Sequence, residues 1–432
     1  MSTLVNRIWA ALTRGHEPLA VLGLGFVGLH EAVAFARAGF NVIGYDIDVA
    51  KIQDLRMGKV AAGTVDPHDL RDALDSGRLR FTTDAADMRD IRAAVICVPT
   101  PVRAGGRPDL AAVRIASRTA AKALTRPGLL VLTSTVPPGT TRDIVVSEAT
   151  SIGLRTGQDV AVVYSAERVD PGNKRFPYRK IPRVLSGLDA DSTALGRRLY
   201  RRVIARVHVA PTLEVAEMSK VLENCWRLVN ISFMNEMALL AKERGIDIWE
   251  VVQAASTKPF GFMPHYPGAG VGGACIPWAP HYLLGQDGAD NTESHMLRDA
   301  LDRNAAMPEY IAKRVLELMA AEPKARGVVI IGVTYKPNVA DTRESPGLRL
   351  INALQQRECA VDYHDPLVPQ VTINDRVLVS ATLTSEYLAH RVAVLVTAHS
   401  SIDYDSLVKH ALRVFDTRNS LSRYQNEKIV RL

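Results

Sequence analysis

The sequence predicts an α/β protein in which two regions of alternating strands and helices flank a helical region. Short apolar runs that end in glycine, threonine or aspartate recur up to about residue 205 and again after about residue 320. Between these regions, apolar residues recur with the periodicity of helices. A chain of 432 residues is also too long for one typical core, so we expect two or three domains.

Composition excludes several classes of protein. Hydrophobic residues make up 47% and charged residues 23% of the chain, as in ordinary globular proteins. The net charge of +7 is spread without a long basic block, so we expect a small anionic substrate and no nucleic acid. The four cysteines lack the paired spacing of zinc sites or a disulfide framework, which indicates reduced thiols in the cytoplasm and no metal. Arg7 and Arg14 interrupt the first apolar run, so neither a signal peptide nor a membrane span is expected.

The first region opens with a pattern typical of dinucleotide binding. A buried strand at residues 19–22 is followed by Gly23, Gly25 and Gly28 in the spacing GxGxxG, and then by a helix over residues 29–38. These glycines would let the backbone approach a pyrophosphate at a helix N-terminus, although they could also only shape a tight turn. Asp46 ends the next strand, 18 residues beyond Gly28, where a carboxylate would bind a ribose diol and repel a 2′-phosphate. The pattern therefore favours NAD over NADP.

Polar residues also follow the later strands of this region. Thr100 and Thr135 come after strands at residues 94–98 and 129–133, so both should line the same crevice, although a lone threonine there is usually a turn residue. Glu167 follows a strand at residues 160–164. We expect it to face the cleft rather than to be an ion-paired surface acid.

The helical region begins at a good N-cap signal, Pro211 and Thr212, and continues as one long helix towards Gly245. A helix of this length either connects the two α/β regions or packs against its copy in a dimer. Lys220 and Asn224 are four residues apart and share one face, either as functional groups or as part of a solvated stripe.

Two further segments suggest chemistry. Cys275 lies in the run GVGGACIP, where glycines clear space around a thiol that needs a base or a cation to ionise. In the last region, a loop containing Lys336 and Arg343 separates a strand at residues 327–332 from a helix that begins at Gly347. This loop is suited to a phosphate, although a solvated charged loop has the same composition.

Taken together, these segments resemble the nucleotide-sugar 6-dehydrogenases, a family that includes UDP-glucose, UDP-N-acetylglucosamine and GDP-mannose dehydrogenases. The resemblance extends from about Pro18 to Asp416. The motifs are GLGFVGL from Gly23, STVPPGTT from Ser134, AERVDPGN from Ala166, KVLENCWRLVNISFMNE from Lys220, GVGGACIP from Gly270 and YKPNVADTRESP from Tyr335. The stretch TKPFGFMPHYPGAGVGG looks most like the UDP-N-acetylglucosamine branch, while UDP-glucose remains an alternative.

The resemblance implies an NAD-dependent, four-electron oxidation of a sugar C6 alcohol to a carboxylate through a thiohemiacetal and a thioester on Cys275. Lys220 would stabilise the oxyanion and Asn224 would position the intermediate. Glu167 and Thr135 match positions concerned with proton transfer through an ordered water. The implied cofactor-binding residues are Gly23, Gly25, Phe26, Val27, Gly28, Asp46, Thr100 and Thr135. The implied substrate-binding residues are Glu167, Lys220, Asn224, Tyr266, Gly272, Lys336 and Arg343.

The same resemblance implies two Rossmann-like domains joined by the long central helix, with a helical dimerisation region and the active site between the domains. We expect an NAD-binding domain at residues 1–205, a central helical dimerisation domain with the catalytic cysteine at 206–320, and a nucleotide-sugar-binding domain at 321–432. The partners expected are a UDP-sugar and a second copy of the chain.

One departure from the family pattern bears on function. Relatives usually have an aspartate four residues after the cysteine, and this chain has Ala279. Loss of that carboxylate should impair thioester hydrolysis or activation of the cysteine. Three readings follow: a complete oxidation at a reduced rate, an altered enzyme that stops at the aldehyde or performs another NAD-assisted reaction, or a UDP-sugar-binding protein without turnover. The first is favoured because Cys275, Lys220 and Asn224 are all present.

Overall fold

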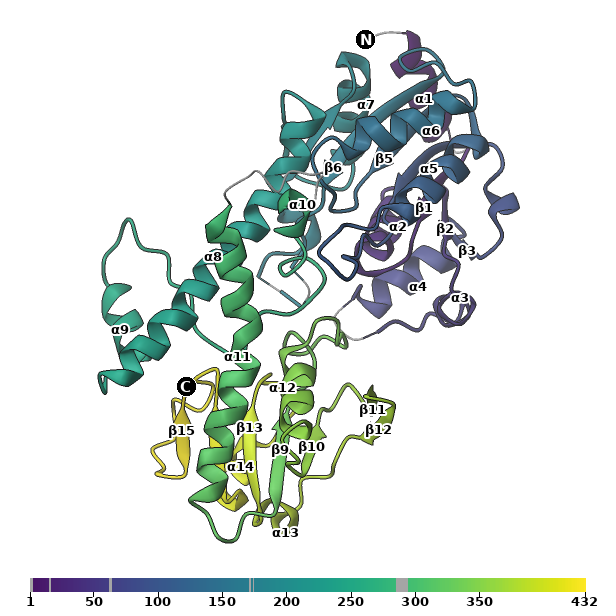
Figure 1. The fold of residues 1–432 in the computed structure, drawn as a ribbon. Coiled ribbons are helices and arrows are strands. Elements are labelled where there is room, and N and C mark those ends of the chain that lie inside the picture. The colour runs from purple at the N-terminus through teal and green to yellow at the C-terminus, as the bar shows by residue number, and fades with distance from the viewer. Residues whose placement is uncertain (1–2, 15–16, 62–63, 171, 174, 285–293) are drawn as a thin grey trace. The chain divides into compact units, whose positions relative to one another are not determined.

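A computed structural model describes residues 3–14, 17–61, 64–170, 172–173, 175–284 and 294–432. The chain divides into two compact units (Figure 1). The first comprises Met1–Glu223 and His281–Asn291, and the second comprises Asn224–Pro280 and Thr292–Leu432. Helix α8 (Leu213–Glu243) begins in the first unit and ends in the second as one continuous element of 31 residues, as the N-cap signal and apolar periodicity predict.

The first unit contains an eight-stranded sheet in the order β3-β2-β1-β4-β5-β6-β7-β8. All neighbouring strands are parallel except β6 and β7. In sheet order, the strands are β3 (Leu79–Thr82), β2 (Val42–Tyr45), β1 (Leu19–Leu22), β4 (Ile91–Ile96), β5 (Leu124–Leu132), β6 (Val160–Ala166), β7 (Arg183–Gly187) and β8 (Val207–Val209). The chain order reverses between β1 and β4, which is where open α/β sheets bind their ligands.

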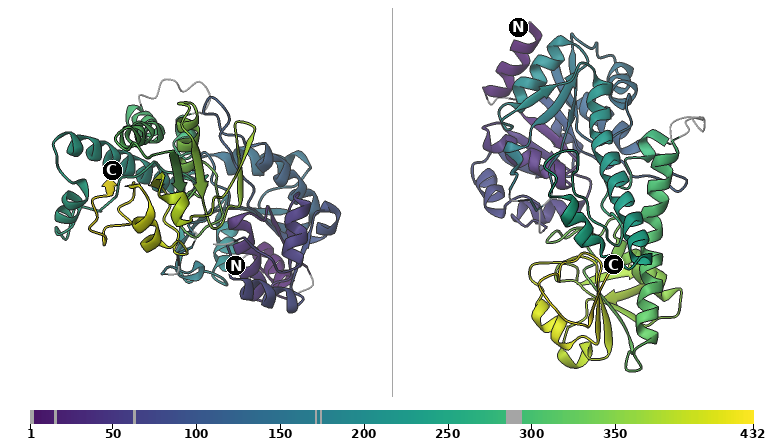
Figure 2. Two further views of the ribbon diagram at one scale, coloured as in Figure 1. Left: turned by 90° about the horizontal axis from the view of Figure 1, so that it is seen from below. Right: turned by 90° about the vertical axis from the view of Figure 1, so that its left-hand side faces the viewer.

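Helices cover both faces of this sheet (Figures 1 and 2). One face packs against α1 (Thr3–Thr13), α2 (Phe26–Arg37), α3 (Val49–Arg56), α4 (Pro67–Asp75) and α7 (Ala190–Tyr200). The other face packs against α5 (Ala111–Ala123), α6 (Ser147–Ser151) and the start of α8. Because both faces are covered, the central strand β1 is apolar and buried at every position. The short helix α10 (His281–Leu284) also belongs to this unit.

The second unit contains a parallel five-stranded sheet and a two-stranded antiparallel hairpin. The sheet consists of β10 (Val361–His364), β9 (Gly327–Ile331), β13 (Arg391–Leu395), β14 (Arg413–Asp416) and β15 (Ile429–Arg431), and the hairpin of β11 (Gln370–Ile373) and β12 (Arg376–Val379). One face packs against α11 (His295–Ala320) and α12 (Pro346–Gln355), and the other against α13 (Ser385–Leu388) and α14 (Tyr404–His410). A smaller cluster joins the end of α8 to α9 (Ile248–Ala255).

This architecture confirms the predicted fold class of two α/β sheets with long central helices. The division into three domains at residues 205 and 320 stays a prediction. Among the described residues, no helix combines the length and the apolar character needed to cross a membrane.

Candidate active site

The three glycines after β1 have different structural roles. Gly23 has a φ of +86°, and a Cβ atom there would lie 2.9 Å from the carbonyl oxygen of Cys97. A Cβ atom on Gly28 would lie only 1.8 Å from the carbonyl oxygen of Gly23. These two glycines are therefore required by the turn itself. By contrast, no described atom lies within 4 Å of a Cβ atom built on Gly25, whose φ is an ordinary −71°.

The open space beside Gly25 lies at the N-terminus of α2. Phe26 and Val27 form the first turn of that helix, which has no acidic side chain. The sequence placed the start of the helix at residue 29, so the helix begins three residues earlier than predicted. Free N–H groups, a favourable helix dipole and space for close approach are the features that bind a pyrophosphate.

Asp46 follows β2 and is nearly fully buried. Its carboxylate accepts hydrogen bonds from the backbone N–H groups of Leu24 at 2.8 Å and Asp48 at 3.0 Å. The Lys51 ammonium group donates a further bond at 2.8 Å. Burial acts to raise the pKa of Asp46, but these donors outweigh burial and lower it. Asp46 is therefore an ionised acceptor at the end of its strand, as recognition of a ribose diol requires.

Thr100 and Thr135 lie together, which agrees with their predicted positions after neighbouring strands. The Thr100 hydroxyl donates to the carbonyl oxygen of Thr135 at 2.7 Å. It also lies 3.0 Å from the hydroxyl of Tyr282, which donates to the Thr100 carbonyl oxygen at 2.7 Å. No local pattern predicts that the buried Tyr282 of α10 lies beside Thr100, because the two residues are 182 positions apart.

Glu167 is buried at the end of β6 and is therefore not a surface acid. One of its carboxylate oxygens accepts a hydrogen bond from the backbone N–H of Val169. This bond fixes a carboxylate at the end of a central strand, as predicted.

Lys220 and Asn224 lie one turn apart on α8. Lys220 is half-buried, whereas Asn224 is 4% exposed. The side-chain nitrogen Nδ2 of Asn224 has no hydrogen-bond partner within the described part of the chain. Since an unsatisfied buried amide costs free energy, this donor is available to a ligand and does not belong to a solvated stripe.

The Cys275 thiol is exposed, in a segment of the second unit that packs on the loop after β9. A Cβ atom on Gly272 would lie 2.7 Å from the Glu344 carbonyl oxygen, so the two segments approach closely only because residue 272 is glycine. The Gly273 N–H donates to the Arg343 carbonyl oxygen at 2.9 Å. The Trp278 indole N–H donates to the Glu344 carboxylate at 3.3 Å. The nucleophile candidate is thus held against the loop expected to bind phosphate.

Ala279 lies one helical turn after the thiol and is fully buried. Its backbone N–H donates to the Cys275 carbonyl oxygen at 3.1 Å. The methyl group of Ala279 is therefore shielded from solvent and lies next to the backbone of the turn formed by residues 275–279.

The other three thiols all have raised pKa values. Burial raises the pKa of Cys225 to about 12. Burial also raises the pKa of Cys97 and of Cys359. Since the thiolate is the nucleophile, none of these three is suited to covalent catalysis.

In the loop after β9, Arg343 forms an ion pair with Asp341, with 2.5 Å between Nη2 and Oδ2. The Arg343 guanidinium still has donors for a phosphate, but Asp341 offsets part of its charge. Lys336 is half-buried in the same loop. Tyr266, another predicted substrate residue of this unit, is exposed and stacks on Trp249 with ring centroids 6.0 Å apart.

A buried network that the sequence did not reveal supports this loop. His399 is fully buried, and its Nδ1 atom accepts a hydrogen bond from the Asn338 N–H at 3.0 Å. Its Nε2 atom lies 3.1 Å from the Asp365 carboxylate and 3.1 Å from the Thr334 hydroxyl. The Asn338 side chain also accepts from the backbone N–H of Ser400 at 3.0 Å. These contacts fix the backbone that carries Lys336.

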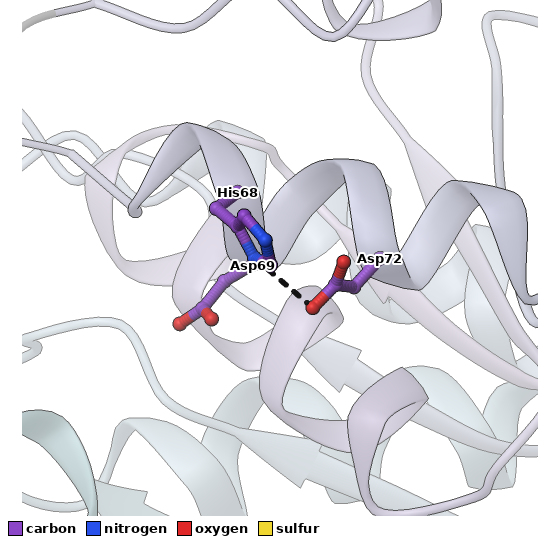
Figure 3. A group of neighbouring side chains, drawn as sticks. All are labelled: His68, Asp69 and Asp72. Atoms are coloured by element: carbon purple, nitrogen blue, oxygen red, sulfur yellow. Dashed lines mark ion pairs between the residues drawn. The ribbon is translucent and has the colours of Figure 1, made fainter.

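One group of side chains on α4 resembles a metal site in composition. Ligand atoms of His68, Asp69 and Asp72 lie within 4.8 Å of one another (Figure 3). Asp69 pairs with Arg37 at 2.7 Å, and His68 pairs with Asp72 at 3.2 Å. These contacts account for the grouping, and we assign no metal to it.

Comparisons with known proteins agree with this geometry. The UDP-glucose/GDP-mannose dehydrogenase family matches in three parts: its NAD binding domain at residues 17–204, its central domain at 214–306 and its UDP binding domain at 329–423. The chain is 34% identical to the UDP-N-acetyl-D-mannosamine dehydrogenase of Pyrococcus horikoshii over 81% of this chain and 84% of the relative. It is 33% identical to the UDP-N-acetyl-D-glucosamine 6-dehydrogenase of Pseudomonas aeruginosa over 88% and 90%, respectively.

Solved structures show the same likeness. A UDP-D-ManNAc dehydrogenase from Pyrococcus horikoshii superposes with a TM-score of 0.82 at 31% identity, covering 93% of this chain and 95% of the other. A UDP-glucose dehydrogenase from Pyrobaculum islandicum gives a TM-score of 0.81 at 29% identity, covering 94% and 95%.

The NAD-binding features of the first unit, the exposed cysteine of the second and these matches along nearly the whole chain lead to one assignment. The chain belongs to the UDP-glucose/GDP-mannose dehydrogenase family and is an NAD-dependent nucleotide-sugar dehydrogenase.

Proposed function

We propose that this enzyme oxidises the C6 hydroxyl of a UDP-N-acetylhexosamine to the uronic acid. The observation that carries the proposal is the exposed Cys275 thiol, presented on glycines in a chain with matched NAD-binding and UDP-binding domains. UDP-N-acetylglucosamine remains the first choice of sugar. UDP-N-acetylmannosamine stands beside it, because relatives at similar identity are named for each.

The residues after β1 and β2 fit NAD. Gly25 leaves space at the N-terminus of α2 for a pyrophosphate, and the ionised Asp46 suits a ribose diol. Bound NAD supplies the hydride acceptor for both oxidations. Thr100 and Thr135 would line the neighbouring strand ends, while Gly23 and Gly28 shape the turn.

The first oxidation removes a hydride from C6 and a proton from its hydroxyl. We assign receipt of that proton to Glu167 through an ordered water, with Thr135 orienting the water. The Cys275 thiolate then adds to the aldehyde to form a thiohemiacetal. Loss of a second hydride and a proton gives a thioester, and water releases the carboxylate and the thiol. The balance is one alcohol, one water and two NAD+ consumed for one carboxylate, two NADH and three protons.

Charge develops on the sugar oxygen during the steps on the thiol. The Lys220 ammonium would stabilise that oxyanion, and the unpartnered Asn224 amide would hold the intermediate. Arg343 and Lys336 would bind the diphosphate, while Gly272 and Tyr266 would contact the substrate near the cysteine.

A second candidate function rests on Ala279. The buried methyl group offers no carboxylate to activate the thiol or the hydrolytic water. The chain could therefore stop at the aldehyde or perform another NAD-assisted reaction on the same sugar. A role in binding alone is disfavoured, since an exposed thiol presented on glycines serves no purpose in it.

We also propose a homodimer formed through α8. Exposed apolar side chains recur along this helix at spacings of three, four and seven residues, namely Val215, Met218, Leu222, Trp226, Phe233 and Leu240. That spacing gives a continuous apolar stripe, which a second copy of the same helix would cover. Four unpaired thiols fit the reducing cytoplasm as the place of action.

The test incubates the protein and NAD with each UDP-sugar separately, following NADH by absorbance and the sugar by mass spectrometry. Two NADH per uronic acid, with no acid from Cys275→Ala, is the expected result. One NADH with an aldehyde would establish the second candidate function. Cys225→Ala is the matched control, because its thiol is buried and should not be needed.

A further inference from the structure

A buried ion pair in the first unit has no part in the reaction described so far. Glu31 on α2 and Arg183 at the start of β7 are 0% and 2% exposed. The Arg183 Nη2 atom donates to the Glu31 Oε1 atom at 2.5 Å and to the Tyr178 hydroxyl at 2.8 Å. The Arg183 guanidinium also lies 4.8 Å from the ring centroid of Tyr200. Ionic groups are rarely buried to this degree in a domain core, so the pair calls for an explanation.

The strand register places this pair beside Glu167. Strands β6 and β7 are antiparallel, and Ala166 is paired with Val184. Extending that register by one residue sets Glu167 opposite Arg183, and opposed residues of an antiparallel pair share a face. Leu185, two residues after Arg183, lies in the core on the face that α2 covers. Arg183 and Glu167 therefore belong to the same face of the sheet as Glu31.

The electrostatic surroundings agree with that placement. The charge of Glu167 acts on six titratable side chains, namely His30, Glu31, Cys97, Tyr164, Tyr178 and Arg183. Burial lowers the pKa of His30 and raises the pKa values of Cys97, Tyr164 and Tyr178, which keeps all four uncharged near neutral pH. Arg183 is thus the one permanent cation in this set.

The charges of Glu31 and Glu167 both act on the Arg183 guanidinium. Burial raises the pKa of Glu31 and the Arg183 charge lowers it, while the Glu167 charge raises it further. Within the described part of the chain, Glu31 Oε2 and Arg183 Nη1 have no hydrogen-bond partner, so each member of the pair retains an unused atom. The pair is consequently able to respond to a change of charge on Glu167.

We propose that Glu31 is a positioning residue for proton transfer by Glu167. By holding Arg183 in an ion pair, it keeps the guanidinium from binding Glu167 and sets the pH range in which Glu167 accepts a proton. This inference rests on the role proposed for Glu167 above. Without Glu31, the guanidinium would be uncompensated and would favour the ionised form of Glu167, because a nearby opposite charge favours the charged form of a carboxyl group.

The experiment compares Glu31→Gln with the double variant Glu31→Gln/Arg183→Gln in the full-length enzyme. Infrared spectra are recorded across pH, and the spectrum of the same protein with Glu167→Gln is subtracted from each. In Glu31→Gln the Glu167 carboxylate band should persist to a lower pH than in the parent protein. In the double variant, which has no charge at either position, the midpoint should return towards that of the parent protein.

The matched control is Glu148→Gln. Glu148 is also a buried acid of the first unit, and it pairs with Arg114 at 2.9 Å and Arg118 at 2.7 Å on α5. Its loss should lower stability without moving the Glu167 midpoint. A midpoint that is unchanged in Glu31→Gln, or that moves equally in Glu148→Gln, would overturn the inference.

The pH dependence of kcat provides the readout during turnover, and its acid limb should move in the same direction as the infrared midpoint. Failure of the proposed function would appear separately, as absence of NADH with either UDP-sugar, because the infrared measurement needs no turnover. NADH formation with an unmoved infrared midpoint would reject the role of Glu31 alone.

Discussion

Gly25 and Gly28 belong to the same motif, yet alanine should affect the protein in opposite ways at these two positions. At Gly25, a methyl group would meet no described atom within 4 Å, and the backbone already has a φ of −71°. At Gly28, the same methyl group would lie 1.8 Å from the Gly23 carbonyl oxygen. We therefore expect Gly25→Ala to weaken cofactor binding without damage to the fold, and Gly28→Ala to damage the fold.

The magnitudes follow from these positions. Alanine at Gly25 restricts the unfolded chain by about 0.4–1 kcal/mol in favour of folding but is a poorer N-cap by a similar amount, so stability should change by less than about 1 kcal/mol. Loss of one charge-assisted bond to a pyrophosphate costs about 1.5–3 kcal/mol, so the Kd for NAD should rise roughly 10- to 150-fold. At Gly28, where the backbone itself must move, we expect a loss of about 3 kcal/mol.

Urea unfolding and calorimetric titration with NAD measure the two effects separately. Gly25→Ala with parental affinity for NAD would refute the assignment of the open space to the pyrophosphate. A loss of stability in Gly25→Ala equal to that in Gly28→Ala would refute the geometric argument for both positions.

Three further predictions concern other parts of the molecule. Ala279→Asp should accelerate thioester hydrolysis in rapid-quench experiments by restoring a carboxylate one turn from Cys275, whereas Ala279→Asn should not, and equal rates in the two variants would contradict this role. Burial raises the pKa of Glu217 to about 7. The unfolded chain therefore releases this proton at a lower pH than the folded protein does, and the free energy of unfolding should fall by up to about 3 kcal/mol as the pH rises from about 4.5 to 7. Urea unfolding should therefore show Glu217→Gln gaining stability relative to the parent between pH 5 and 8, and a constant difference would reject the shifted pKa. Phe233→Glu, placed in the exposed α8 stripe, should halve the mass found by light scattering, and an unchanged dimer would show that another surface joins the copies.

The sequence predicted those parts of the fold in which one local pattern determines the outcome. Strand β1 occupies residues 19–22 as expected, because four apolar residues precede a glycine turn. Helix α8 followed from an N-cap signal and a long apolar period. Strand β7 was not predicted, since a five-residue strand that begins with a buried arginine has no distinct signature. Glu31 did provide a signal, as a charged residue on the apolar face of α2, but its meaning depends on an arginine 152 positions away.

The candidate site shows the same division. Gly25 and Asp46 could be identified because their motif has a fixed spacing along the chain. The closeness of Thr100 to Tyr282, and the support that His399 gives to the loop of Lys336, depend on long-range contacts that no local spacing encodes.

Because the four thiols differ in exposure, a thiol reagent should label the native enzyme selectively at Cys275. Only Cys275 among them combines an exposed side chain with a place in the proposed chemistry, while burial suppresses thiolate formation at Cys97, Cys225 and Cys359. After brief treatment of the folded protein with a maleimide or an iodoacetamide, the amount of bound label would give the number of active sites that contain a reactive Cys275. Its exposure also makes the Cys275 sulfur the first target of peroxide, so oxidation would inactivate the enzyme without unfolding it.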